Sequence, residues 1–331
     1  MAIIKAWACY LKLPSQMRKK TIEFIKDRLG PENLMVLDVG AKGGVQSLFM
    51  LDKFTNYVGF EPNLAEFSRL TEAPNIKYYP CVLSKVNGER KLLITDYPSY
   101  SSLLEFNDRT FDKHFHFMED LPAWKKRFKV VGQVEIPSYT LSTFMDQNEF
   151  DFIDFIKLDT QGTELEILQS ATDKLKDKRI GVIYSEVTFI EAYKNQNLFS
   201  DLEIFLREHD YEFIDCKYYP GSFDTFNPRL GSKIIEKPRY SLGGDAIFIP
   251  NIDAANLSND VCFRIGLVLA SLKYFSVSYH YLSNSGMAAE EIDHLLRSFN
   301  KPGIKNLLRQ IFPPVLMHLM KSVFRTFKSN R

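Results

Sequence analysis

Short apolar runs alternate with amphipathic runs along most of this chain. An amphipathic helix is predicted at residues 15–30 and ends at Gly30 and Pro31. The apolar runs that follow predict strands at residues 34–39, 57–60, 76–83, 152–158, 180–187, 211–218 and 245–250. The amphipathic runs between them predict helices at residues 45–53, 64–71, 164–175 and 199–209. Such alternation is typical of an α/β fold in which helices connect parallel strands.

The pattern changes in two places, and these changes divide the chain. Between about residues 86 and 150, "GERKLLIT" and "VVGQVEIPSYTL" predict added strands around the aromatic stretch "SYSSLLEFNDRTFDKHFHFMEDLPAW". A loop rich in glycine and proline is predicted at residues 220–244, and beyond residue 252 only helices are predicted, at residues 261–272, 288–299 and 304–327. We therefore expect an N-terminal helical segment at 1–30, a main domain at 31–250 with the insertion, and a helical C-terminal extension with a basic tail at 251–331.

The composition indicates a globular protein without a nucleic-acid partner. The 331 residues are 45% hydrophobic, which is enough for a large core, and 42 Lys and Arg nearly balance 41 Asp and Glu. The start of the chain lacks a convincing signal sequence, and no run of about 18 apolar residues occurs, so a cytoplasmic protein is expected. The four cysteines lie far apart without a CxxC spacing, which argues against a zinc site and against a disulfide framework.

The C-terminal tail differs from the rest of the chain in charge. Residues 301–331 contain seven basic residues and no acidic one, mixed with large apolar side chains. This profile is typical of a helix that lies on anionic lipid, so peripheral contact with the inner face of a membrane is one hypothesis. Packing on the main domain or on another subunit explains the tail equally well, because Pro313 and Pro314 interrupt any continuous apolar face. The oligomeric state stays open.

A glycine-rich turn follows the first predicted strand in "VLDVGAKGG". Gly40, Gly43 and Gly44 lack Cβ atoms, which lets the chain turn sharply and lets a ligand approach the backbone. Glu61 ends the next predicted strand, 21 residues after Gly40, where a carboxylate can accept hydrogen bonds from two ribose hydroxyls. Together they predict a nucleoside site. The simpler interpretation is a strand-turn-helix with incidental glycines and a structural Glu61.

The spacing of this turn distinguishes between two nucleosides. The dinucleotide fingerprint is G-x-G-x-x-G, whereas this chain has Asp38-x-Gly40-x-x-Gly43-Gly44. An acid two residues before the first glycine would repel a pyrophosphate, but it suits a ligand that carries an ammonium and a sulfonium. That ligand is S-adenosylmethionine. An NAD-dependent sugar oxidoreductase is the alternative enzyme, and a non-catalytic scaffold in a glycan-assembly complex is a third hypothesis.

A second cluster, "DFIKLDTQGTELEILQSA" at residues 154–171, gives the strongest signal. Taken with "DVGAKGG", "GFEPN", "SSLLE", "YTLSTFM", "SEVTFIEAY" and "GGDAIFI", it resembles the FkbM family of S-adenosylmethionine-dependent methyltransferases, in order from about residue 35 to 250. The resemblance implies a Rossmann-like class I methyltransferase fold: a doubly wound, mostly parallel sheet of seven strands with an antiparallel last strand. It also implies methyl transfer to a hydroxyl oxygen of a saccharide, glycan or natural product.

The resemblance also implies which residues hold the cofactor. The first loop would be formed by Asp38, Gly40, Ala41, Gly43 and Gly44. Glu61, followed by Pro62, would hold the ribose. Val82, Leu83 and Ser84 would lie near the adenine.

On the acceptor side, the hydroxyl must lose a proton, for which a general base typically contributes 10²–10⁴-fold. Asp159 is the expected base because it ends a strand beside the cofactor cleft; capping of the following helix is its other possible role. Glu186, which ends the neighbouring strand, would bind a substrate hydroxyl or support the base. Gln161, expected to contact substrate, stands where many family members have glutamate. If that glutamate accepts the proton elsewhere in the family, this chain needs another base.

Two further features belong to the acceptor side. A pair of carboxylates can bind a divalent metal, but we predict none because further oxygen ligands are not identifiable. His114 and His116, as alternate residues, could share one face of a strand and contact substrate, bind metal or act as a base; a solvated loop is the simpler explanation. The aromatic insertion is the expected acceptor lid because aromatic rings stack on sugars, although ordinary packing explains its composition nearly as well.

Overall fold

The computed structural model describes residues 19–115, 121–218 and 241–300. It divides into two compact units, one of residues 26–286 and one of residues 1–25 with 287–331. The sequence predictions for His116, for most of the loop at 220–244, for the helix at 304–327 and for the basic tail lie outside the described residues. The boundary expected near residue 250 lies inside the larger unit. That the chain folds as separate segments on either side of it stays a prediction.

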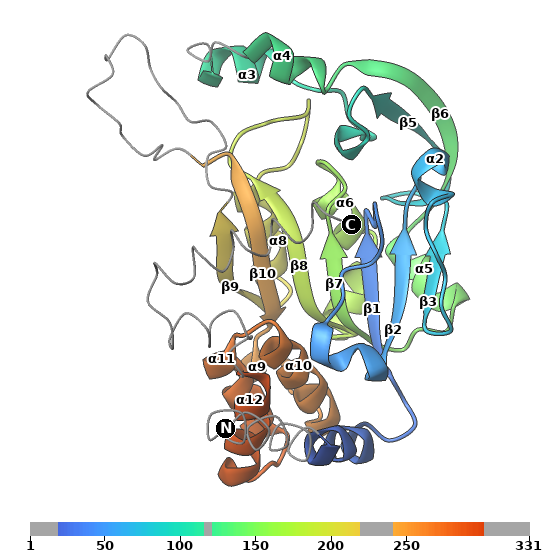
Figure 1. Ribbon diagram of the computed structural model, residues 1–331. Helices are drawn as coiled ribbons and strands as arrows, with labels where there is room; N and C mark the ends of the chain where they lie inside the picture. The colour runs from blue at the N-terminus through green and yellow to red at the C-terminus, as the bar shows by residue number, and fades with distance from the viewer. Residues whose placement is uncertain (1–18, 116–120, 219–240, 301–331) are drawn as a thin grey trace, which may run out of the picture. The chain divides into compact units, whose positions relative to one another are not determined.

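The larger unit is built around a seven-stranded sheet with the order β3-β2-β1-β7-β8-β10-β9 (Figure 1). Its strands are β1 (Leu34–Val39), β2 (Thr55–Phe60), β3 (Ile76–Tyr79), β7 (Ile153–Leu158), β8 (Ile180–Thr188), β9 (Tyr211–Tyr218) and β10 (Gly243–Pro250). The first five strands of that order are parallel, and β10 is antiparallel to both β8 and β9. This confirms the predicted fold class. The order reverses between β1 and β7, which is where open α/β sheets bind ligands.

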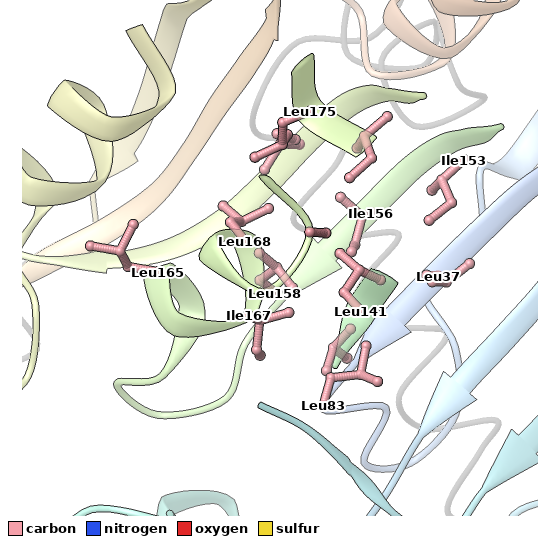
Figure 2. Close-up of a cluster of buried hydrophobic side chains, with 14 of the residues drawn as sticks. Leu37, Leu83, Leu141, Ile153, Ile156, Leu158, Leu165, Ile167, Leu168 and Leu175 are labelled. Atoms are coloured by element: carbon pink, nitrogen blue, oxygen red, sulfur yellow. The ribbon is translucent and has the colours of Figure 1, made fainter. Parts of the chain in front are cut away.

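The central strands are buried on both faces because helices cover them. Leu37 of β1 and Ile156 and Leu158 of β7 belong to the main apolar cluster. Figure 2 shows how side chains from several helices meet them there. The helices that contribute are α5 (Leu141–Gln147), α6 (Glu164–Gln169), α7 (Thr172–Lys176) and α8 (Phe199–Arg207). Burial of this cluster supplies the main stabilisation of the sheet.

Two predicted elements take other forms. The expected helix at 45–53 is replaced by an irregular segment at 45–48 and the short 3-10 helix η1 (Phe49–Phe54). The N–H groups of Gln46 and Leu48 are satisfied there by the side chains of Asp38 (2.6 Å) and Tyr57 (3.0 Å) instead of by helical carbonyls. The expected strand at 76–83 divides at Pro80, which has no N–H group, into β3 and β4 (Val82–Leu83).

The insertion forms a second sheet with the order β4-β6-β5. β5 (Gly88–Thr95) and β6 (Val130–Tyr139) are antiparallel, which confirms the two added strands. The aromatic stretch between them contains η2 (Pro98–Tyr100) and the helices α3 (Asp108–Phe115) and α4 (Leu121–Lys126), where a loop was expected. Figure 1 shows this insertion beyond the carboxyl ends of the main strands.

The remaining described elements are helical. They are the helix at residues 19–29, α2 (Leu64–Phe67), α9 (Ile252–Ala255), α10 (Asn259–Ser271), α11 (Phe275–Asn284) and, in the smaller unit, α12 (Ala289–Phe299). The sequence missed α11 because serine and aromatic residues with weak helix propensity dominate it. Its Ser278 hydroxyl donates to the Gly266 carbonyl of α10 at 2.7 Å, so packing on α10 supports it. None of the described helices is long and apolar enough to cross a membrane.

A buried ion pair joins α10 to the amino ends of the central strands. The Arg264 guanidinium donates to both oxygens of Asp154 in β7, at 2.9 and 2.8 Å, and to the Asn33 carbonyl before β1. Asp154 also accepts the Met35 N–H at 2.6 Å. Burial raises the pKa of Asp154 to about 6, although Arg264 favours its charged form. The pair therefore fixes α10 against the sheet at a cost in desolvation.

We predict that Arg264→Met lowers the free energy of unfolding by about 3–5 kcal/mol, because it leaves a buried carboxylate without its counter-ion. The loss should be greater at pH 8 than at pH 5. Without Arg264, the pKa of Asp154 in the folded state lies even further above its pKa in the unfolded chain. The free energy of unfolding of the variant therefore falls as the pH rises from 5 to 8. Urea unfolding at both pH values measures the effect. The double variant Asp154→Leu with Arg264→Met should recover the lost stability, because it removes the buried carboxylate as well. If Arg264→Met alone were as stable as the wild type, the pair would contribute nothing to stability.

Candidate active site

A cavity of about 340 Å³ lies at the carboxyl ends of β1, β2, β7 and β8, beneath the insertion. Its volume falls in the range of small-molecule sites. Eight of the residues singled out from the sequence line it: Gly40, Glu61, Pro62, Val82, Leu83, Asp159, Gln161 and Glu186. Segments nearly 150 residues apart in the chain thus contribute to one cavity.

Gly40 shows why the first loop needs glycine. Its φ is +97°, and a Cβ atom there would lie 2.1 Å from the Asp159 carbonyl oxygen of the loop after β7. The N–H groups of Gly40 and Ala41 both donate to the Phe60 carbonyl at the end of β2, at 3.1 and 2.9 Å. The turn is therefore held between the two neighbouring strands, with its backbone exposed to the cavity.

Asp38 stabilises this loop through its buried carboxylate. Its carboxylate is 2% exposed and accepts the Gln46 N–H at 2.6 Å, while Lys157 of β7 lies 3.3 Å away. Burial raises the pKa of Asp38, and Lys157 opposes the shift. Asp38, Ala41, Gly43, Gly44 and Ser84, all expected to contact the cofactor, are not among the described residues that line the cavity. A direct contact from them stays a prediction, because Asp38 here supports the loop.

Glu61 directly follows β2 and is 5% exposed. Its Oε1 accepts the Asn63 N–H at 2.8 Å, and its Oε2 accepts no hydrogen bond from the residues that the structure describes. Burial raises the pKa of Glu61. The Oε2 atom is not among the buried side-chain atoms that lack a partner, so it is accessible from the cavity, where a ligand can donate to it. This geometry suits the predicted role in binding ligand hydroxyls.

The wall next to Glu61 is apolar. Phe60, Cys81, Val82, Leu83 and Leu92 line it, and Val82 and Leu92 also belong to the small core beneath the second sheet. Burial raises the pKa of the Cys81 thiol to about 12, so it stays protonated and acts as an apolar contact. A flat aromatic base can be held against such a wall.

The opposite end of the cavity is acidic. Asp159 lies 3.3 Å from Lys157, which also contacts Asp38. The Gln161 side-chain amide donates to Asp159 Oδ1 at 3.1 Å and to Glu186 Oε2 at 2.7 Å. Gln161 thus joins the two carboxylates that were predicted to be catalytic, and both line one cavity. Lys157 links this acidic end to Asp38, which supports the cofactor loop.

Glu164 holds the loop between β7 and α6. Its Oε1 accepts the backbone N–H groups of Thr160 (2.8 Å) and Gly162 (3.2 Å), and its side chain is buried. The N-cap residue of α6 is Thr163, and no side-chain hydrogen bond caps this helix, so the capping role considered for Asp159 is not observed. Asp159 is 38% exposed, so its carboxylate can reach a bound molecule.

His114 lies in the helix α3 (Asp108–Phe115), where a strand face had been considered. The His114 side chain and all of His116 lie outside the described part of the chain. A contact of either histidine with substrate stays a prediction.

The aromatic residues of the insertion mainly pack against one another. Phe128 stacks on Tyr100 and on Phe106, with ring centroids 4.2 and 4.1 Å apart, and Phe111 packs on Trp124 at 4.6 Å. Tyr100 also lines the cavity, as does the segment 98–103 around it. The insertion therefore combines the two roles considered from sequence: a small aromatic core and a cover for the cavity.

Sequence reasoning missed two residues at this site. Lys157 interrupts the apolar strand "DFIKLD" two residues before Asp159, a signal that could have been used. Tyr193 carries no such signal; it is buried, and its hydroxyl donates to Gln161 Oε1 at 2.9 Å. Among the described residues no group of three or more His, Cys, Asp or Glu side chains is arranged to hold a metal ion.

Several solved methyltransferase structures resemble the chain weakly. Magnesium protoporphyrin IX methyltransferase from Synechocystis PCC 6803, with bound S-adenosylmethionine, is 8% identical over 73% of this chain and 79% of that chain, with a TM-score of 0.30. A TehB-like methyltransferase from Corynebacterium glutamicum is 10% identical over 75% and 98%, with a TM-score of 0.31. Such values carry no argument about substrate or mechanism. Comparison with curated proteins gives no match.

A family model is decisive. The model described as "Methyltransferase FkbM domain" matches residues 38–213, which is more than half of the 331 residues. The match starts at Asp38 and ends within β9, so it includes the glycine loop, Glu61 and the acidic end of the cavity. The site and the sheet order that carries it agree with this match, and the chain belongs to the FkbM methyltransferase family.

Proposed function

We propose that this methyltransferase uses S-adenosylmethionine and transfers the methyl group to a hydroxyl oxygen of a saccharide or related natural product. The observation that carries the proposal is the placement of Glu61 and the joined carboxylates Asp159 and Glu186 around one cavity. Family membership supports methyl transfer over the hydride transfer that a dinucleotide enzyme would perform.

The residues present fit this cofactor. S-adenosylmethionine supplies an electrophilic methyl carbon on a positively charged sulfur. The exposed backbone at Gly40 admits close approach, Glu61 Oε2 is available for ribose hydroxyls, and the wall from Cys81 to Leu83 suits the adenine. The acidic end around Asp159 stabilises a nearby positive charge.

The carboxylates indicate oxygen as the methyl acceptor. A hydroxyl must lose its proton as the carbon–oxygen bond forms and the carbon–sulfur bond breaks, and Asp159 receives that proton. Lys157, 3.3 Å away, and the Gln161 amide, which donates at 3.1 Å, hold the Asp159 carboxylate in a fixed orientation. Segment 98–103 of the insertion lines the cavity, so it can help to hold the acceptor oxygen in line with the methyl carbon and the sulfur.

The lining of the insertion supports a polyhydroxyl acceptor. Tyr100 offers an aromatic face, and Ser99, Ser101 and Ser102 bring hydroxyl groups to the cavity. Sugars have both an apolar ring face and many hydroxyls, so they match such a lining. Mass spectrometry of glycans and small molecules from the host, with and without the protein, should show a product that loses one CH₂ unit when the protein is absent.

We predict that Glu61→Ala weakens binding of S-adenosylmethionine and of its demethylated product by about 10- to 100-fold, because hydrogen bonds to a charged acceptor contribute about 1.5–3 kcal/mol. Isothermal titration calorimetry measures both. Burial raises the pKa of Glu61, so wild-type affinity should fall as the pH is lowered and the carboxylate is protonated. Glu203→Gln, which loses a pair with Arg207 on α8, is the matched control. A wild-type protein that binds neither ligand would contradict the cofactor assignment.

We predict that Asp159→Asn keeps the fold and the cofactor affinity but lowers the rate of methyl transfer at least about 100-fold, the scale expected for a lost base. Transfer of labelled methyl to a panel of sugars and nucleotide sugars measures the rate. Asp173→Asn removes an acid of α7 that pairs with Lys174 and should have no effect. A rate unchanged by Asp159→Asn would mean that another group accepts the proton.

A further inference from the structure

Gln161 adopts a backbone conformation that is unusual for a residue with a side chain. Its φ is +60°, and Gly162 follows with a φ of +109°. Residues other than glycine hold such angles only where the surroundings impose them. Here the Ser102 hydroxyl of the insertion donates to the Gln161 carbonyl at 2.7 Å. The insertion therefore helps to fix the position from which the Gln161 side chain extends.

The amide of Gln161 uses both of its polar atoms within the site. Its nitrogen donates to Glu186 Oε2 at 2.7 Å and to Asp159 Oδ1 at 3.1 Å. Its oxygen accepts the hydroxyl of the buried Tyr193 at 2.9 Å. The reverse orientation would place the amide oxygen against two carboxylates, so the network selects the orientation described. One nitrogen thus holds an oxygen of each carboxylate at the same cavity.

The neutrality of this amide matters because the two lysines among the described residues that line the cavity have other partners. Lys42 donates to the Ser99 hydroxyl at 2.9 Å and favours the charged form of Glu61. Lys157 lies 3.3 Å from Asp159, but it is equally close to Asp38. A carboxylate at position 161 would add a third negative charge within hydrogen-bond distance of Asp159 and Glu186. Like charges at such distances disfavour the ionised forms. An amide provides the same shape with a donor and without a charge.

We propose that Gln161 is a positioning residue that holds the carboxylates of Asp159 and Glu186 side by side without adding a charge, so that the site takes an acceptor with two neighbouring hydroxyl groups. Asp159 receives the proton of the hydroxyl that is methylated, and Glu186 accepts a hydrogen bond from the hydroxyl beside it. This inference rests on the proposed function. It adds that a vicinal diol, as found in a sugar ring, is a better acceptor than a lone alcohol.

The first test does not depend on activity. Thermal unfolding is measured between pH 5 and pH 8 for the wild type, Gln161→Glu and Gln161→Met. The new carboxylate has a raised folded-state pKa, so Gln161→Glu should lose stability progressively as the pH rises. Gln161→Met, which removes the donor without adding a charge, should lose less stability over the same interval. A parallel pH dependence for Gln161→Glu and the wild type would overturn the charge argument.

The second test measures the reaction. The acid limb of the pH–rate profile should move upward by about one pH unit in Gln161→Glu, because the added charge makes Asp159 harder to ionise. Tyr193→Phe, which keeps residue 161 unchanged, should lower kcat about tenfold while leaving cofactor affinity within about twofold. A cis-diol sugar should exceed its deoxy analogue, which lacks the neighbouring hydroxyl, in kcat/KM by at least about tenfold. Unchanged profiles, or equal rates on both sugars, would overturn the inference while leaving methyl transfer itself established.

Discussion

The carboxyl ends of β1 and β7 approach so closely that only glycine fits at position 40. The Asp159 N–H donates to the Val39 carbonyl at 2.9 Å, and the Asp159 carbonyl occupies the space that a Cβ of Gly40 would need. Lys157 adds an ionic link between the same two loops, because it contacts both Asp38 and Asp159. The cofactor side and the acceptor side of the proposed reaction are therefore held at a fixed separation, as an in-line displacement requires.

The site contains buried charge that a purely structural core would avoid. Burial raises the pKa of Asp38, Glu61 and Glu164, and each is stabilised by backbone N–H groups or by Lys157 instead of by water. Such groups lower stability unless they are paired, and they gather at functional sites. The Asp154–Arg264 pair at the amino ends of the strands shows the contrasting case, in which a buried charge only joins structural elements.

The insertion takes part in the geometry of the site as well as covering it. Its aromatic core, with Phe128 stacked between Tyr100 and Phe106, positions the segment that carries Ser102. Ser102 then holds the backbone of Gln161, whose amide orients both carboxylates. Variation in such an insertion can therefore change acceptor choice and catalytic alignment together, while the sheet beneath stays the same.

The sequence by itself determined the class of fold, most strands and several of the residues that line the cavity. The strands at 34–39, 88–95 and 211–218 were predicted with the observed bounds, because alternating or continuous apolar patterns report which faces of a strand are buried. Gly40, Glu61 and Asp159 could be found for a similar reason. A turn that needs glycine can be recognised from the local sequence, and so can an acid at the end of a strand.

Only the tertiary structure decided how these groups act on one another. It assigned Asp38 to support of the loop, attached Glu164 to the loop before α6, and brought Tyr193 to Gln161. It also replaced the helix expected at 45–53 by an irregular segment and a 3-10 helix, held by side chains from the strands. Lys157 and Asp38 are 119 residues apart in the chain, so no local pattern encodes their contact. The spacing of apolar residues indicates which face of a segment is buried, and it can be read from that segment alone. Charge balance and hydrogen-bond partners depend on which segments the fold brings together.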